Sequence, residues 1–159
     1  MNKSPHQLAT LSQLGANLLP PTQEVRVDTS VGIEALLKTL EQPRARAVGA
    51  VLQALVTLLA REDLVPAFDV LAPRAAPDAL RRFGYLCERL ATSPQGEGME
   101  ARLNALVTRA AVETSTVASK EPLALSLRVR PSDRRRERDE VHRRWGVLAP
   151  RDVWTAFVH

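Results

Sequence analysis

The sequence predicts a mainly α-helical protein, a compact bundle of five or six helices with one or two short β-strands near residues 24–27 and 123–129. Two observations lead to this prediction. Apolar residues recur at three- and four-residue spacing through most of the chain, which is the period of an amphipathic helix. Aromatic residues make up only 4% of the chain and hydrophobic residues 45%, so the core must be aliphatic. Packed helices suit such a core better than a β-sandwich does.

The chain divides into an arm and a body. Its 159 residues fit one domain with an extension. Residues 1–24 are predicted to be an N-terminal arm, whose leucines fit one short helix before the Pro20–Pro21 pair. We expect this arm to dock on its own body. Residues 25–159 are predicted to form a single helical domain that carries a basic segment at 128–144.

Three helices are predicted in the first half of the body. The first follows a capping residue within positions 28–30, because Asp, Thr and Ser accept hydrogen bonds from free backbone N–H groups, and it ends before Pro43. The second covers residues 44–61 and is apolar around much of its circumference, so we expect it to be the most buried. The third covers residues 64–71.

The most distinctive helix is predicted over residues 79–90. Its apolar stripe consists of Leu80, Phe83, Cys87 and Leu90. The interior glycine Gly84 costs a helix about 1 kcal/mol relative to alanine, so we expect another element to approach closely there. Four charged residues are predicted on the solvent side, namely Arg81, Arg82, Glu88 and Arg89.

The remainder of the chain is predicted to mix loop, helix and strand. Residues 92–98 have the composition of a loop. A helix follows, with Leu103, Leu106, Val107 and Ala110 facing inward, and residues 113–121 are predicted to be loop. Residues 123–129 alternate between apolar and other side chains, the period of a half-buried strand. Both tryptophans lie in the last fifteen residues, so we expect this end to pack on the body.

Catalytic and metal-binding patterns are not evident in the sequence. None of the histidines His6, His142 and His159 has a partner at metal-ligand spacing, and no phosphate-binding glycine loop or serine nucleophile motif is present. We therefore expect no enzyme activity, no metal and no cofactor. A single cysteine on an apolar stripe indicates a buried thiol, and the N-terminus lacks a signal peptide, so we expect a soluble cytoplasmic protein.

The basic segment supports two interpretations. Its arginines could neutralise phosphates and so bind nucleic acid: Arg134, Arg135, Arg136, Arg138, Arg143 and Arg144. The alternative is a solvated or partner-facing helix in which arginine and acidic side chains offset each other. The second interpretation is favoured, because the net charge of the segment is moderate and no aromatic residues are interleaved with it.

One stretch supports a family resemblance. The segment Arg81-Arg82-Phe83-Gly84-Tyr85-Leu86-Cys87-Glu88 resembles an "arg-arg-leu-gly-tyr-leu-leu-glu" stretch in the C-terminal region of the AbiEi family, the antitoxins of type IV toxin–antitoxin systems. A looser match to an earlier stretch begins at Val27. A strand at 123–129 and a Trp145-Gly146-Val147 segment follow in the family's order. The family's N-terminal winged-helix domain has no counterpart in the two dozen residues before Val25.

The resemblance implies a non-enzymatic protein-binding module that neutralises a nucleotidyltransferase-like toxin. On this hypothesis we expect the contacts to come from exposed positions of the distinctive helix, namely Arg81, Arg82, Tyr85 and Arg89, because tyrosine and arginine are favoured at interface hot spots. Two alternatives stay open. One is a DNA-binding regulator that uses the basic segment, and the other is a structural subunit of a larger assembly.

Overall fold

A computed structural model describes residues 27–115, 122–126 and 139–158. The predicted N-terminal arm (1–24), residues 24–26 of the first predicted strand, residues 127–129 of the second and residues 128–138 of the basic segment lie outside the described residues. The described part is mainly helical, which confirms the predicted fold class. It contains seven α-helices, more than the predicted five or six, and a sheet of two short strands.

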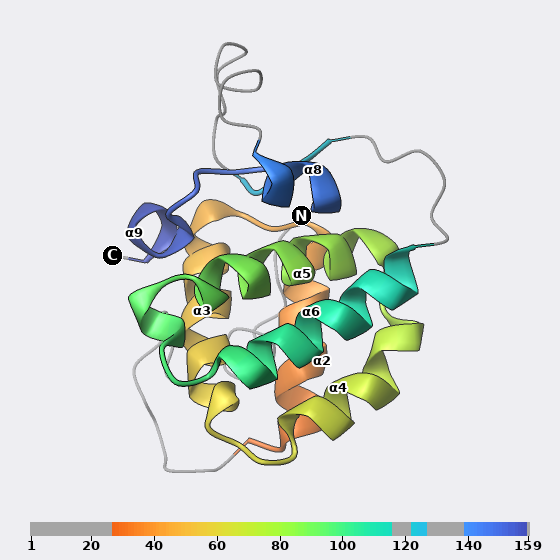
Figure 1. Ribbon diagram of the computed structural model, residues 1–159. Helices are drawn as coiled ribbons and strands as arrows, with labels where there is room; N and C mark the ends of the chain where they lie inside the picture. The colour runs from red at the N-terminus through yellow and green to blue at the C-terminus, as the bar shows by residue number, and fades with distance from the viewer. Residues whose placement is uncertain (1–26, 116–121, 127–138, 159) are drawn as a thin grey trace.

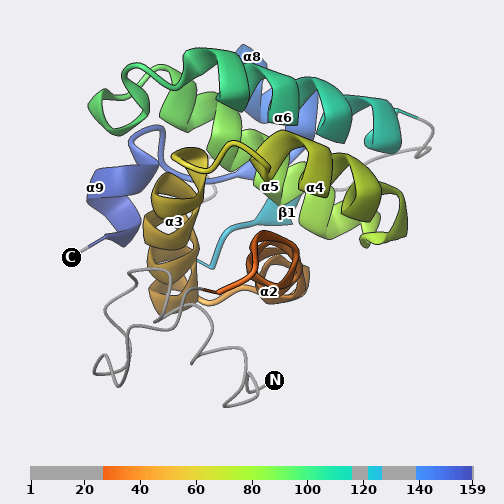
Figure 2. The same ribbon diagram turned by 90° about the horizontal axis from the view of Figure 1, so that it is seen from below.

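The first two helices stand behind the others in Figure 1. Helix α2 (Thr29–Glu41) begins as predicted, because the side chain of Asp28 accepts a hydrogen bond from the Ser30 N–H at 2.9 Å. Helix α3 (Ala45–Leu59) is buried around much of its circumference, and every residue from 47 to 52 is buried. Figure 2 shows α2 end-on, with α3 and α4 on either side of it.

The next helices form the front layer. Helix α4 (Leu64–Leu71) covers the predicted residues and is followed by a 3₁₀ turn, η1 (Ala72–Arg74). Helices α5 (Pro77–Ala91) and α6 (Glu100–Thr114) are joined by a loop that contains the short turn η2 (Pro94–Gly96). They lie side by side and make the most extensive helix–helix contact in the described chain (Figure 1).

A two-stranded parallel sheet ties residues 123–124 to the C-terminal segment. Strand β1 (Leu123–Ala124) lies within the predicted strand, and its partner β2 (Val147–Leu148) was not predicted. The Leu123 N–H donates to the Gly146 carbonyl at 2.7 Å. The strand ends at Ala124, and two residues later the backbone at Ser126 turns left-handed (φ 49°), which does not fit an extended strand.

The C-terminal segment covers one side of α5. It consists of α8 (Glu140–Trp145), β2 and α9 (Val153–Phe157), and it lies along the upper and left edges of the bundle in Figure 1. Trp145 is buried and Trp154 is half-buried, so the prediction that this end packs on the body is confirmed. Among the described helices none combines the length and the apolar character that a membrane crossing requires.

Candidate functional site

The predicted contact residues of α5 are mostly buried. The prediction that Arg81, Arg82 and Tyr85 lie on an exposed face is wrong, because all three are buried, and Arg81 is only 2% exposed. The side chain of Arg89 is 11% exposed. The physical reason is that α5 is enclosed on several sides. Helices α6 and α2 pack against it, with Arg82 turned to α2, and the C-terminal segment covers the face that carries Arg81, Tyr85 and Arg89.

Arg81 holds the end of α8. Its Nε donates to the Trp145 carbonyl at 2.9 Å, and its Nη2 donates to the Gly146 carbonyl at 3.0 Å. Carbonyl groups in the last turn of a helix lack partners within the helix, so the guanidinium group supplies the missing donors. Burial lowers the pKa of Arg81, and the neighbouring Asp78 carboxylate opposes that effect.

Arg82 holds the end of α2 by bonds to backbone carbonyls, on another side of α5. Its Nη1 donates to the carbonyls of Leu40 at 2.7 Å and Glu41 at 2.9 Å. Burial lowers the pKa of Arg82 as well. In the same way, Arg102 of α6 donates to the Leu59 carbonyl at the end of α3. Neighbouring helices therefore supply the donors at three helix ends, and the Arg81–Arg82 pair is structural.

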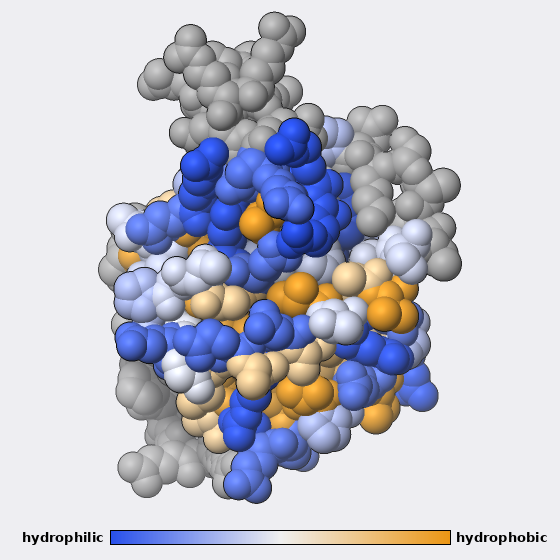
Figure 3. Space-filling model, in the orientation of Figure 1, coloured by the Kyte–Doolittle hydropathy of each residue, from blue (hydrophilic) through white to orange (hydrophobic). Residues whose placement is uncertain are grey.

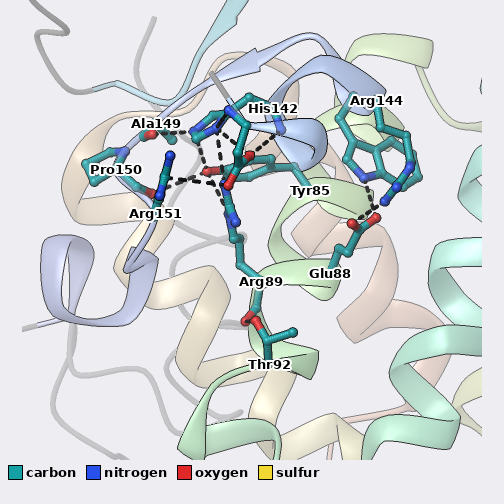
Figure 4. A network of polar contacts seen from close by, with 11 residues as sticks. Tyr85, Glu88, Arg89, Thr92, His142, Arg144, Ala149, Pro150 and Arg151 are labelled. Carbon is teal, nitrogen blue, oxygen red and sulfur yellow. Dashed lines mark hydrogen bonds and ion pairs between the residues drawn. The ribbon is translucent and has the colours of Figure 1, made fainter. Parts of the chain in front are cut away.

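Tyr85 and Arg89 belong to a buried polar network with Asp139 and His142, which we call the α5–α8 network (Figure 4). The Arg89 Nε donates to the Tyr85 hydroxyl at 3.1 Å, and its Nη2 donates to both Asp139 oxygens at 2.9 and 2.8 Å. Asp139 also caps α8, since its Oδ1 accepts from the His142 N–H at 3.0 Å.

The hydrogen bonds place hydrogens on two groups of this network, the His142 Nε2 and the Tyr85 hydroxyl. The His142 Nε2 lies 2.7 Å from the Ala149 carbonyl oxygen, which can only accept, so Nε2 carries a hydrogen. The Tyr85 hydroxyl then accepts from Arg89 and donates to the Pro150 carbonyl at 3.3 Å. Each of these polar groups is thus engaged in joining α5, α8 and the loop before α9.

The network also sets the charges of its members. Burial opposes ionisation of Asp139, but its hydrogen bonds from the His142 N–H and from Arg89 outweigh that cost and lower its pKa. Burial likewise opposes the charge of Arg89, yet the hydrogen bonds to Tyr85 and Asp139 raise its pKa. Burial raises the pKa of Tyr85. Asp139 and Arg89 therefore form a stable ion pair.

Sequence reasoning missed Asp139 and His142 in these roles. A signal was present in the sequence, because Asp139 precedes His142 by three residues. This is the spacing of a capping box, in which the side chain of the later residue bonds to the backbone N–H of the N-cap residue. The structure forms such a box, in which the His142 Nδ1 accepts from the Asp139 N–H at 3.3 Å. The contact of both residues with α5 spans about fifty residues of sequence, so local pattern could not predict it.

Only two of the six arginines predicted to bind nucleic acid are described. Arg143 and Arg144 are exposed on α8, and Arg134, Arg135, Arg136 and Arg138 lie outside the described residues. Arg144 pairs with Glu88, which raises the pKa of Arg144, and it also lies 3.4 Å from Glu140. The other Glu88 oxygen accepts from the Trp145 Nε1 at 3.1 Å. The described end of the basic segment is therefore largely charge-balanced.

An apolar surface lies over α4 and α6. Figure 3 shows orange and tan side chains over these two helices, with blue side chains between them, on the face turned to the viewer. Its most exposed members are Val70 of α4 (65%) and Val112 of α6 (58%). The helices are neighbours, since the Arg109 Nε of α6 lies 4.0 Å from the Asp69 carboxylate of α4. We call this surface, defined by Val70 and Val112, the α4–α6 face; sequence analysis did not single it out.

In the described residues no three His, Cys, Asp or Glu side chains gather as metal ligands. Comparisons with protein families, curated proteins and solved structures found no match to this chain.

Proposed function

We propose that this protein is a non-enzymatic protein-binding module that contacts its partner through the α4–α6 face. The observation that carries the proposal is the pair of exposed valines, Val70 and Val112, on two neighbouring helices whose visible face bears further apolar side chains (Figure 3). Large contiguous apolar patches on protein surfaces mark interaction sites, whereas single exposed apolar residues are common, so the proposal depends on the two valines being covered by the same partner. Removing one such valine from water would contribute about 1.5 kcal/mol to association.

The face also differs from α5 in what its side chains are free to do. The polar residues of α5 are engaged in holding α2 and α8, as the bonds of Arg82 and Arg81 show. Val70 and Val112 do not hold other helices in this way, and neither is among the buried residues of its helix. A partner can therefore cover them without disturbing the fold.

The partner class comes from the family resemblance. The segment Arg81–Glu88 resembles the antitoxin region of the AbiEi family, and this favours a nucleotidyltransferase-like toxin as the partner. The buried positions of Arg81 and Arg82 fit a shared structural role for this segment better than a role in recognition. The DNA-binding and structural-subunit readings stay as alternatives that the same experiment separates.

The experiment is affinity capture of the tagged full chain from its native host, with half of each sample treated with nuclease. Two variants, Val70→Glu and Val112→Glu, place a charge on the α4–α6 face. The matched control is Val31→Glu, because Val31 is also an exposed valine (42%) but lies on α2. Circular dichroism establishes that each variant has the helix content of the wild type.

We expect one protein to co-purify with the wild type and Val31→Glu in both halves, and to be lost from Val70→Glu and Val112→Glu. Recovery that depends on intact nucleic acid would instead support the basic segment and overturn the proposal. Capture of several stoichiometric subunits would favour the structural-subunit reading. Equal capture by all four proteins would show that the α4–α6 face is not the contact.

A further inference from the structure

A pocket lies between the end of α5 and the start of α9. It has a volume of about 290 Å³, which is the size of a small ligand with one ring. Arg89 and Thr92 line it from α5 and the residue after it, and Arg151 and Trp154 line it from the C-terminal segment. The α4–α6 face involves other helices, so this pocket is independent of the proposed function.

Two guanidinium groups of the pocket lie against the same carboxylate. Arg89 and Arg151 both approach the same oxygen of Asp139: the Arg89 Nη2 lies 2.8 Å and the Arg151 Nε 3.5 Å from Oδ2. Figure 4 shows Arg151 beside the head of Arg89. A single carboxylate therefore serves two guanidinium groups. The side chain of Arg151 is 59% exposed, so it is accessible to a ligand.

The remaining polar groups of the lining define what can bind. The Thr92 hydroxyl donates to the Arg89 carbonyl at 3.2 Å and the Ser93 hydroxyl to the Leu90 carbonyl at 2.9 Å, so their hydrogens are used. Asp152 also lines the pocket, and its carboxylate accepts from the N–H and the hydroxyl of Thr155. The Arg89 Nε and Nη2 groups already donate to Tyr85 and Asp139, so the exposed guanidinium group of Arg151 supplies most of the donors left for a ligand.

We propose that this pocket binds a small carboxylic acid with a ring-shaped body. The planar carboxylate suits the guanidinium fork of Arg151, whose side chain is 59% exposed. A phosphate dianion fits less well, because the Asp152 carboxylate would repel its second charge. The half-buried indole of Trp154 offers a flat apolar surface against which a ring can pack.

The test is a titration of the ¹⁵N-labelled full chain with benzoate, followed by NMR. The readout is the indole N–H resonance of Trp154, assigned with Trp154→Phe. Benzamide is the matched control ligand, since it has the same shape without the charge. We expect benzoate to shift this resonance with a dissociation constant of roughly 1 mM, as befits a fragment-sized ligand, and benzamide and inorganic phosphate to leave it unchanged.

Two variants test whether Arg151 contributes to benzoate binding. Arg151→Gln should weaken benzoate binding roughly tenfold, because it removes a charged donor. Arg143→Gln, which changes an exposed arginine of α8 outside the pocket, should bind as the wild type does. Equal shifts with benzoate and benzamide, or an unchanged constant in Arg151→Gln, would overturn the proposal. If a peptide bound through its C-terminal carboxylate more tightly than benzoate does, the pocket would instead be assigned to the C-terminus of a protein.

Discussion

The indole ring of Trp145 occupies the space beside Gly84 that any other side chain would fill. A Cβ atom at position 84 would lie 2.3 Å from the Trp145 Cη2. The neighbouring turns of α5 hold the same element, since Arg81 donates to the Trp145 carbonyl and Glu88 accepts from its indole N–H. One face of α5 is therefore shaped to receive α8, and this explains the glycine in the middle of the helix.

The contact between Gly84 and Trp145 can be tested by a double-mutant cycle. Gly84→Ala should lower the free energy of unfolding by about 1–3 kcal/mol, because overpacking at the ring exceeds the roughly 1 kcal/mol that alanine contributes to helix propensity. In a Trp145→Leu background the same change should be neutral or stabilising. Urea denaturation measures both, and an equal effect of Gly84→Ala in the two backgrounds would contradict the contact.

The role of Arg82 predicts a loss of stability rather than of binding. Arg82→Met keeps much of the side-chain volume but leaves the Leu40 and Glu41 carbonyls without their donor, so the free energy of unfolding should fall by about 2 kcal/mol. The control is Arg74→Met at an exposed arginine of η1, which should change stability by less than about 0.5 kcal/mol. Similar urea midpoints for the two variants would show that the buried bonds contribute little.

Asp139 predicts a dependence of stability on pH. Its pKa is lower in the folded protein than in the unfolded chain, so folding favours its ionised form. This stabilisation should be complete above about pH 5 and should be lost as the pH falls below about 3.9 toward the folded-state pKa. Asparagine also caps helices well, so Asp139→Asn keeps the α8 cap while it removes the charge.

The measurement is the difference in unfolding free energy between the wild type and Asp139→Asn across this pH range. We expect a difference of about 2 kcal/mol near pH 7, allowing for partial exposure of the pair, and a smaller one near pH 3. Other carboxylates cancel in the difference, so a value that stays constant from pH 7 to pH 3 would contradict the assigned role of Asp139.

Cys87 predicts slow thiol chemistry in the folded state. The side chain is fully buried in the core, and burial raises its pKa, so the reactive thiolate is scarce. Its reaction with a colorimetric disulfide reagent should follow transient unfolding and accelerate with added urea. A native-state rate equal to that of an unfolded peptide thiol would contradict this burial.

The sequence predicted most helices because their signals are local. The residues of α4 agree with the prediction, and α2 begins at the predicted cap, since spacing, prolines and a capping aspartate act over a few positions. Strand β2 was missed because two residues carry no period, and it forms only by pairing with β1. The glycine at 84 correctly indicated the close approach of another element.

The polar face of α5 could not be predicted in the same way. Charged residues normally mark the solvent side of a helix, but ten of the fifteen α5 residues are buried. Arg81 and Arg82 tolerate burial because carbonyls some forty and sixty-five residues away accept their hydrogen bonds. A local pattern contains no information on partners at that separation.

Partner capture by Arg81→Lys and Val112→Glu, compared side by side, separates the two faces most directly. Both variants are assayed at a temperature at which circular dichroism shows them folded. We predict that Arg81→Lys has a lower urea midpoint but still binds the partner. Val112→Glu should keep the wild-type urea midpoint but lose the partner. The opposite result would contradict this account and assign the contact to α5. In that case Arg81→Lys would keep its stability but lose the partner, and Val112→Glu would still bind the partner.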